Sequence, residues 1–91
     1  MNDILGDIPS EEIEDFYRTV SANVKRLRTA KKLSQLEVAL RLGIRSIAFY
    51  SNCENLRYSK HFNLEHLYRL SKALEVDMCE LLKPLAVSDM V

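Results

Sequence analysis

The sequence predicts a single all-α domain of five helices. Apolar residues recur at spacings of three and four in several separate segments, which is the period of amphipathic helices, and no convincing strand is present. With 47% hydrophobic residues, only two glycines and two prolines, the chain has the composition of an ordered globular protein. Its 91 residues are enough for one modest core and too few for a second independent domain.

The first helix is expected from about Ser10 to Lys31. Pro9 and Ser10 are start signals, with Ser10 as the expected N-cap and acidic residues in the first turn behind it. The stretch from Thr19 to Ser21 leaves open a break into two helices. One apolar stripe runs along the whole segment and consists of Ile13, Phe16, Tyr17, Val20, Val24 and Leu27.

Two short helices are expected next. Ser34 is the expected cap of the first, and this helix ends at Gly43, because glycine can adopt the left-handed conformation that turns the chain. Its apolar residues are Leu36, Ala39, Leu40 and Leu42. Ser46 is the expected cap of the second short helix, in which Ile47, Tyr50 and Cys53 lie three apart.

The C-terminal half predicts a loop and two more helices. Residues 55–62 are polar and aromatic without a clear period and predict the loop, and Asn63 is the expected cap of the next helix. Asp77 is the expected cap of a last helical turn or two, which ends at Pro84, and the tail from Leu85 to Val91 is expected to fray. The apolar stripes of these helices are Leu64, Leu67, Leu70, Ala73 and Leu74, and then Val76, Met78, Leu81 and Leu82.

The charges are segregated along the chain, although the net charge is zero. Residues 1–17 hold six acidic residues and no basic one. Residues 18–61 hold ten basic residues against two acidic ones, a net charge of +8. A basic segment of this density is a plausible footprint for a phosphate backbone. For any single lysine, a solvated helical surface is the plainer interpretation.

Several classes of protein are not expected. Cys53 and Cys79 lie far apart without ligand-spaced partners, so we expect two buried, reduced thiols, with no metal site and no disulfide. The histidines, His61 and His66, have no nucleophile or second base at recognisable spacing, so we expect no enzyme, no cofactor and no small-molecule substrate. No signal peptide or membrane segment is evident, and we expect a soluble cytoplasmic protein.

The most informative stretch is LSQLEVALRLGIRSIAFYSNCEN, residues 33–55, in which two short helices meet at Gly43. In a small all-α protein such a pair usually holds its second helix out from the body, so that it fits a major groove about 12 Å wide. Here the chain resembles the lambda repressor and Cro family of helix-turn-helix regulators, of the xenobiotic response element type. The resemblance covers about Asn23 to Leu82. It is carried by Leu33-Ser34-Gln35, Ala39, Leu42-Gly43-Ile44, Ser51-Asn52-Cys53-Glu54-Asn55, Leu64-Glu65-His66-Leu67, Lys72-Ala73-Leu74 and Leu81-Leu82.

The resemblance implies a lambda-repressor-like fold and a bacterial or phage transcriptional regulator. It divides the chain into an acidic N-terminal extension (1–22), helical from about residue 10, a helix-turn-helix domain (23–82) and a tail (83–91). The resemblance also implies that the small residue at Ala39 lets the two short helices cross closely.

The resemblance also assigns structural roles to residues around the second short helix. The positions of Ile44, Tyr50 and Cys53 face the core. Arg28 and Glu54 match an ion pair that locks the first helix to the recognition helix, which spans about residues 46–54. Glu54 is therefore interpreted as structural, because an unpaired carboxylate beside DNA would repel phosphate.

The DNA-facing positions follow from the same resemblance. Gln35 matches a residue that reaches phosphate from a helix N-terminus, and Ser46 and Asn55 are expected as further phosphate contacts. Counted back from Glu54, the base-reading positions are Ile47, Ala48 and Asn52, with Phe49 and Ser51 nearby. An asparagine can pair with an adenine edge, whereas isoleucine and alanine meet thymine methyl groups, which predicts a preference for A·T-rich sites.

The chain departs from the family pattern in two places. The segment from Gly43 to Glu54 is one residue longer, with Arg45 as the apparent insertion, so the register could slip and place Arg45 at a guanine edge or a phosphate. The loop from Asn55 to Asn63 is about two residues longer. Its side chains Arg57, Tyr58, Lys60 and His61 are expected to contact the DNA backbone, with a solvated loop as the alternative.

The main alternative function is a protein-binding use of the same fold, antitoxin-like or as an accessory subunit, with the acidic first helix docking a partner. Double-stranded DNA is the expected partner, and a homodimer is expected by analogy, because one recognition helix reads only a half-site. Two surfaces remain open for the dimer: Ile13, Phe16 and Tyr17, or Leu81, Leu82 and Leu85. The sequence does not reveal the operator, the sign of regulation or an effector.

Overall fold

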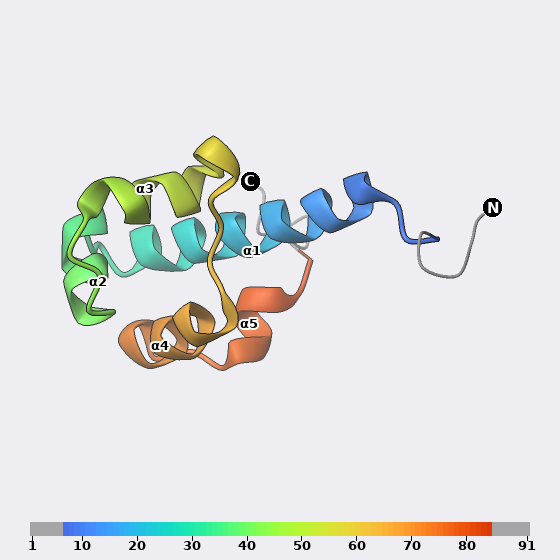
Figure 1. Ribbon diagram of the computed structural model, residues 1–91. Coiled ribbons are helices and arrows are strands. Elements are labelled where there is room, and N and C mark those ends of the chain that lie inside the picture. The colour runs from blue at the N-terminus through green and yellow to red at the C-terminus, as the bar shows by residue number, and fades with distance from the viewer. Residues whose placement is uncertain (1–6, 85–91) are drawn as a thin grey trace.

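The computed structural model describes residues 7–84 and forms five α-helices and a single 3₁₀ turn (Figure 1). No strand occurs within residues 7–84, so the prediction of an all-α domain with five helices is confirmed. The expected fraying of the tail from Leu85 concerns residues outside the described range. The elements are α1 (Ser10–Ala30), α2 (Gln35–Arg41), α3 (Ile47–Asn55), the 3₁₀ turn (Arg57–Ser59), α4 (Leu64–Leu74) and α5 (Met78–Leu82).

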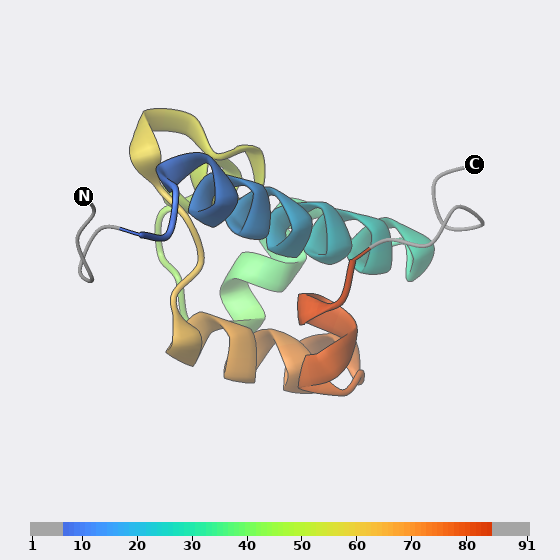
Figure 2. The same cartoon turned by 90° about the vertical axis from the view of Figure 1, so that its right-hand side faces the viewer.

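The long helix α1 is the axis around which the other helices pack. Helix α3 lies along one side of α1, while α4 and α5 lie on the other side (Figures 1 and 2). Helix α2 packs against both α3 and α4 and lies near the C-terminal end of α1. The first turns of α1 project beyond the other helices (Figure 1). This arrangement leaves α3 at the edge of the molecule.

The core lies where these helices meet. It is built from aliphatic side chains of α1, α2, α4 and α5 together with one tyrosine, one phenylalanine and one cysteine, which matches the apolar stripes expected of α1, α4 and α5 over most of their length. The buried apolar residues are Val20, Val24, Val38, Ala39, Leu42, Tyr50, Cys53, Phe62, Leu67, Leu70, Leu74 and Leu81. Burial of such side chains is the main favourable contribution to folding.

Helix α1 is continuous, and its cap lies one residue earlier in the sequence than predicted. Its N-cap is Pro9, whose side chain can accept no capping bond, so the expectation that Ser10 is the cap is wrong: Ser10 is the first helical residue. The break left open between Thr19 and Ser21 does not occur. The Ser21 hydroxyl donates to the backbone oxygen of Cys53 at 2.9 Å, which ties α1 to α3 at that point.

Some residues of the predicted apolar stripes are exposed. Ile13 and Phe16 keep 45% and 48% of their surface, because α1 runs past the end of the body there. Leu36 and Leu40 of α2 and Leu64 of α4 are also exposed. Of the apolar residues expected for α2, Ala39 and Leu42 are buried, together with Val38, which the apolar pattern did not include. Helical period identifies residues that share a face, not whether a neighbour covers that face.

Helix α5 is fastened to α1 by a buried asparagine. The side-chain amide of Asn23 donates to the backbone oxygens of Leu81 at 3.0 Å and Lys83 at 2.7 Å, which satisfies carbonyls left open at the end of α5. Asp77 precedes α5 as expected but makes no side-chain cap bond. Cys79 is exposed, so the prediction of two buried thiols is wrong for this residue, because the core face of α5 presents Leu81.

Candidate nucleic-acid interface

Local hydrogen bonds set the position of α2 and of the turn after it. The hydroxyl oxygen of Ser34 accepts from the backbone N–H of Glu37 at 3.0 Å, and the Glu37 carboxylate accepts from the backbone N–H of Ser34 at 2.8 Å. The bond from the Ser34 backbone holds the pKa of Glu37 below its usual range. At the other end, Gly43 adopts a φ of +77°, and the N–H of Ile44 donates to the carbonyl of Ala39 at 2.9 Å.

Arg45, the residue expected as an insertion, lies in the turn before α3 and not within the helix. Ser46 is the N-cap of α3, and its hydroxyl oxygen accepts from the backbone N–H of Phe49 at 3.1 Å. Arg45 lies before the cap and is exposed. Helix α3 begins at Ile47 and runs without interruption to Asn55. The residues counted back from Glu54 therefore share one regular helix.

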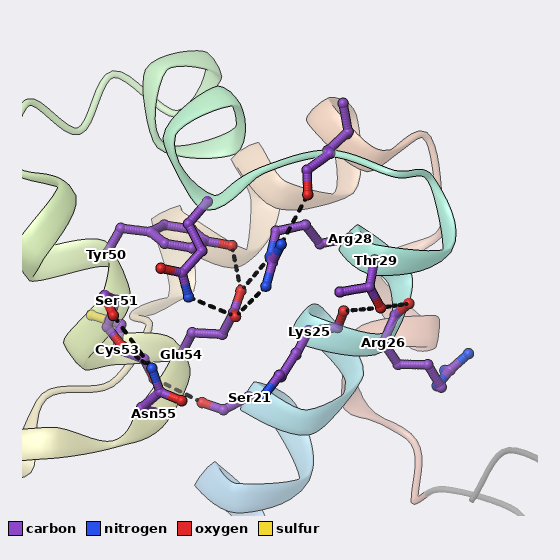
Figure 3. Close-up of polar contacts among 12 residues, drawn as sticks. Ser21, Lys25, Arg26, Arg28, Thr29, Tyr50, Ser51, Cys53, Glu54 and Asn55 are labelled. Carbon is purple, nitrogen blue, oxygen red and sulfur yellow. Dashed lines mark hydrogen bonds and ion pairs between the residues drawn. The ribbon is translucent and has the colours of Figure 1, made fainter. Parts of the chain in front are cut away.

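The carboxylate of Glu54 is the centre of a buried network between α1, α2 and α3 (Figure 3). Arg28 donates to both oxygens, from Nε at 2.9 Å and from Nη2 at 2.8 Å. Gln35 Nε2 donates at 3.0 Å and the Tyr50 hydroxyl at 2.8 Å. The remaining Arg28 donor, Nη1, binds the carbonyl of Leu33 at 2.8 Å. The two charges are thus paired, and further donors satisfy the carboxylate.

These contacts keep Glu54 ionised inside the protein. Burial opposes its ionisation, but the hydrogen bonds from Arg28, Gln35 and Tyr50 together outweigh burial, and the pKa of Glu54 lies below its usual value. Burial, together with the neighbouring negative charge of Glu54, raises the pKa of Tyr50, so its hydroxyl remains a donor. Gln35 was expected to contact phosphate; the structure directs one of its amide N–H groups to Glu54 instead.

The outward face of α3 is free of neighbouring elements over most of its length. Ile47, Ala48 and Asn55 are exposed, and Ser51 and Asn52 are half-buried. These five residues fall on one face by their spacing of three and four, while Tyr50, Cys53 and Glu54 face the interior. The Asn55 amide donates to the carbonyl of Ser51 at 2.9 Å (Figure 3). Small, apolar and amide side chains, rather than charged ones, form this surface.

Phe49 does not share that outward face. It is half-buried against the core, and its ring lies 5.8 Å from the ring of His66 on α4. Phe49 was expected near the base-reading positions; in the structure its side chain packs behind α3, between this helix and α4. His66 is in turn held by Asn63, because the Asn63 N–H donates to His66 Nδ1 at 3.0 Å and the His66 N–H donates to Asn63 Oδ1 at 2.7 Å. Burial lowers the pKa of His66.

The segment that follows α3 has an unusual backbone. Leu56, Tyr58 and Ser59 have φ values of 57°, 56° and 58°, in the left-handed region that glycine tolerates best. For a residue with a Cβ atom this conformation costs roughly 1–2 kcal/mol. Arg57, Tyr58 and Lys60 are exposed, and Tyr58 keeps 80% of its surface. The predicted loop is therefore an ordered turn that presents three long side chains to solvent.

The N-terminal half of α1 supports this loop from the side. The ring of Tyr17 stacks on the ring of His61 with centroids 3.8 Å apart and an angle of 16° between planes. Next to this stack lies an open cavity of about 390 Å³ lined by residues of α1 and of the loop: Ile13, Glu14, Tyr17, Arg18, Leu56, Ser59, Lys60 and His61. Sequence reasoning missed this contact, because a loop without a period gives no signal of what it packs against.

Of the ion pairs within residues 7–84, only the pair of Arg28 with Glu54 involves a residue of α3. The others join Arg18 with Asp15, Arg69 with Glu65, and Lys83 with Glu80. Within residues 7–84, the basic side chains Arg45, Arg57 and Lys60 belong to none of them. Positive charge that is not neutralised by the protein itself thus lies at both ends of α3.

Comparisons with known proteins agree with this geometry. The helix-turn-helix family model matches residues 24–81, a span that includes the Arg28–Glu54 pair, the Gly43 turn, α2 to α4 and all but the last residue of α5. Searches of the curated proteins and of the solved structures give no match. Within the described part of the chain, no helix is long and apolar enough to cross a membrane. Since the match covers more than half of the chain, the protein belongs to the lambda repressor and Cro-like helix-turn-helix family, a family of DNA-binding domains.

Proposed function

We propose that the protein is a small transcriptional regulator that binds double-stranded DNA with a preference for certain sequences, with α3 in the major groove. The observation that supports this most is the uncovered outward face of α3 with exposed basic side chains at both ends. Arg45 precedes the helix, and Arg57 and Lys60 follow it. In duplex DNA, base edges lie in a groove between two rows of phosphates, so a neutral reading face between positive ends is complementary to it.

Within this proposal, Asn52 hydrogen-bonds an adenine edge, and Ile47 and Ala48 contact thymine methyl groups. Ser51 lies on the same face. This combination favours A·T-rich sites. Contacts to bases supply the sequence preference, because phosphates are the same at every position.

The backbone contacts come from residues around α3. Arg45, Arg57, Tyr58 and Lys60 are exposed and bind phosphates directly. Ser46, Asn55 and Gln35 can contribute as well, since each keeps a donor beyond the bond that it makes within the protein. The proposal also places the protein in the cytoplasm, where bacterial and phage DNA lies.

A homodimer belongs to the same proposal, because two copies read two half-sites. The surface formed by Ile13, Phe16 and Tyr17 exposes Ile13 and Phe16 and leaves Tyr17 half-buried. In the other surface, Leu81 is fully buried and Leu82 half-buried within the domain. Leu85 lies outside the described residues. These exposures support pairing through the N-terminal part of α1.

A salt titration of DNA binding tests the proposal. Affinity is measured for the wild type, Asn52→Ala and Arg57→Ala, with duplexes of random sequence and with duplexes taken from genomic regions upstream of genes. We expect wild-type binding to weaken steeply with salt, since phosphate contacts release counterions. Asn52→Ala should reduce the preference between duplexes, and Arg57→Ala should weaken binding to all duplexes and reduce the salt slope by about 1.

Lys72→Ala is the matched control for Arg57→Ala. It removes one exposed positive charge on α4, outside the proposed interface, and should leave both affinity and salt slope near their wild-type values. Absence of binding to any duplex at low salt would contradict the proposed function. Equal effects of Lys72→Ala and Arg57→Ala would show that only net charge matters and would contradict the proposed interface.

A further inference from the structure

The loop after α3 is defined here as Leu56–His61. Hydrogen bonds within the loop contribute little to fixing its backbone conformation. Three of its residues, Leu56, Tyr58 and Ser59, are left-handed without being glycine. Its internal backbone bond joins the N–H of Lys60 to the carbonyl of Arg57 at 2.9 Å. Backbones in such sparsely populated conformations persist when the surrounding structure holds them in place. The surroundings of this loop therefore decide its shape.

Two aromatic contacts hold the C-terminal end of the loop. Phe62, the residue after it, is buried, with its ring 5.4 Å from that of Tyr50. His61, the last residue of the loop, is exposed toward solvent, but its ring lies flat on that of Tyr17 at 3.8 Å. Tyr17 belongs to the second turn of α1, which precedes the segment matched by the family model. A residue outside the matched domain thus supports the loop.

The same loop presents the positive charges that follow α3. Arg57 and Lys60 are exposed, and neither forms an ion pair with residues 7–84. Lys60 also lines the cavity beside Tyr17, so the stack lies directly next to a side chain proposed to contact DNA. The direction in which these two side chains leave the surface depends on the backbone of the loop.

We infer that Tyr17 is a positioning residue for DNA binding: by stacking on His61 it fixes the loop so that Arg57 and Lys60 meet the phosphate backbone. This inference rests on the proposed function. It gives the acidic N-terminal extension a role in DNA affinity although its own charge repels DNA. It also predicts that the tyrosine ring matters and its hydroxyl does not, because stacking uses the ring.

The first test compares Tyr17→Ala with Tyr17→Phe in the salt titration. Tyr17→Ala should lower the salt slope by about 1 to 2 and the affinity for random duplexes about ten- to a hundredfold at 0.1 M salt, as expected when one or both of the phosphate contacts of Arg57 and Lys60 are lost. Tyr17→Phe keeps the ring and should behave as the wild type. An unchanged slope for Tyr17→Ala, with affinity equal to that of the wild type, would overturn the inference.

A double-mutant cycle separates positioning from a general loss of structure. If Tyr17 acts through the two basic side chains, Tyr17→Ala should cause no further loss of slope when it is added to the Arg57→Ala, Lys60→Ala variant. If Tyr17→Ala lowered the salt slope in the Arg57→Ala, Lys60→Ala variant as much as it does in the wild type, Tyr17 would act by another route, and the inference would be overturned. Far-ultraviolet circular dichroism of each variant checks that the helices are formed.

A third measurement needs no DNA. Amide hydrogen exchange of residues 57–61 should be faster in Tyr17→Ala than in the wild type and in Tyr17→Phe, while exchange in α4 stays the same. Unchanged exchange in the loop would overturn the inference. If the wild type binds no DNA, the proposed function fails, and the exchange data still decide whether Tyr17 holds the loop.

Discussion

At the scale of single residues, Glu54 is the residue whose side-chain contacts matter most for the stability of the fold. Its buried carboxylate receives hydrogen bonds from Arg28, Gln35 and Tyr50, which come from three different helices. A charge in such a place is tolerable only with its partners, because an isolated buried ion is strongly destabilising. Removal of either charge leaves the other one buried without compensation.

We therefore predict that Glu54→Ala lowers the free energy of unfolding by about 3–5 kcal/mol, as is typical when one partner of a buried ion pair is removed. Urea unfolding followed by circular dichroism measures this loss. Arg28→Met should cost a similar amount, and the double variant should cost less than the sum of the two. A purely additive double variant would show that the pair does not interact in the folded protein.

His66 is a second residue with a testable effect on stability. Its Nδ1 accepts a hydrogen bond from the Asn63 N–H, which requires that this nitrogen carry no proton. Burial lowers the pKa of His66; the charge of Glu65 opposes this shift and that of Arg69 reinforces it. The unfolded chain takes up the proton near its ordinary pKa of about 6.5, where the folded protein does not. Stability is thus complete above this pH and decreases as the pH falls through the folded pKa.

The expected result is a melting temperature that drops from pH 7.5 to pH 5.5 in the wild type and drops less in His66→Gln. Glutamine can replace histidine as the acceptor at this helix position, but it does not titrate. His61→Gln is the control and should retain the wild-type drop, since it leaves His66 in place. If His66→Gln retained the full drop, another group would be responsible for the pH dependence.

At the scale of helices, the ends of the elements follow local rules better than their faces do. Ser34, Ser46 and Asn63 cap their helices through side-chain bonds as the sequence predicts. The C-terminal end of α4 does not follow these rules, because a glutamate, Glu75, occupies the left-handed C-cap position with a φ of 58°. Glycine is preferred there, since it has no Cβ atom to clash with the backbone.

Glu75→Gly should therefore stabilise the protein, by roughly 0.5–1 kcal/mol. The gain is smaller than the full cost of the left-handed conformation, because glycine also makes the unfolded chain more flexible. Glu75 is exposed, so little packing is lost. Glu75→Ala removes the same side chain without freeing the backbone and should show no gain in urea unfolding. Equal stability of the glycine and alanine variants would contradict this explanation.

The sequence predicted the number, order and approximate bounds of the helices, because capping residues and apolar period are local signals. It did not predict that Phe49 turns inward to His66 or that Gln35 binds Glu54, because these contacts join residues distant in sequence. It also grouped Leu40 and Leu64 with the other apolar residues of their helices, but the structure leaves both exposed. Which face of a short helix is covered depends on neighbours that a single segment does not reveal.

At the scale of the whole molecule, charge and apolar surface are separated along α1. Its first turns hold acidic residues and the exposed side chains Ile13 and Phe16, whereas the basic residues lie toward its C-terminal end and beyond. The projecting end of α1 in Figure 1 is therefore suited to contact protein rather than DNA. This surface is the proposed site of dimer formation.

If so, replacing both Ile13 and Phe16 by serine should convert a dimer into a monomer. Sedimentation velocity measures the mass, with 10.5 kDa as the value for one chain. Leu64→Ser is the matched control, because Leu64 is 75% exposed on α4, away from this surface, and it should leave the dimer intact. A wild type that is monomeric at all concentrations, or a double serine variant that remains dimeric, would contradict pairing through α1.

The network around Glu54 also bears on how the motif can be used outside its own protein. The segment of residues 33–55 contains α2, the turn and α3, but it lacks Arg28, the cation that neutralises Glu54. A peptide of these residues would have to bury an unpaired carboxylate or leave its two helices apart, and helices of 7 and 9 residues do not persist alone in water. Helix α3 is therefore not a transplantable unit. A chimaera designed to carry the proposed DNA preference must either take α1 with it or provide an arginine at the equivalent place in the host.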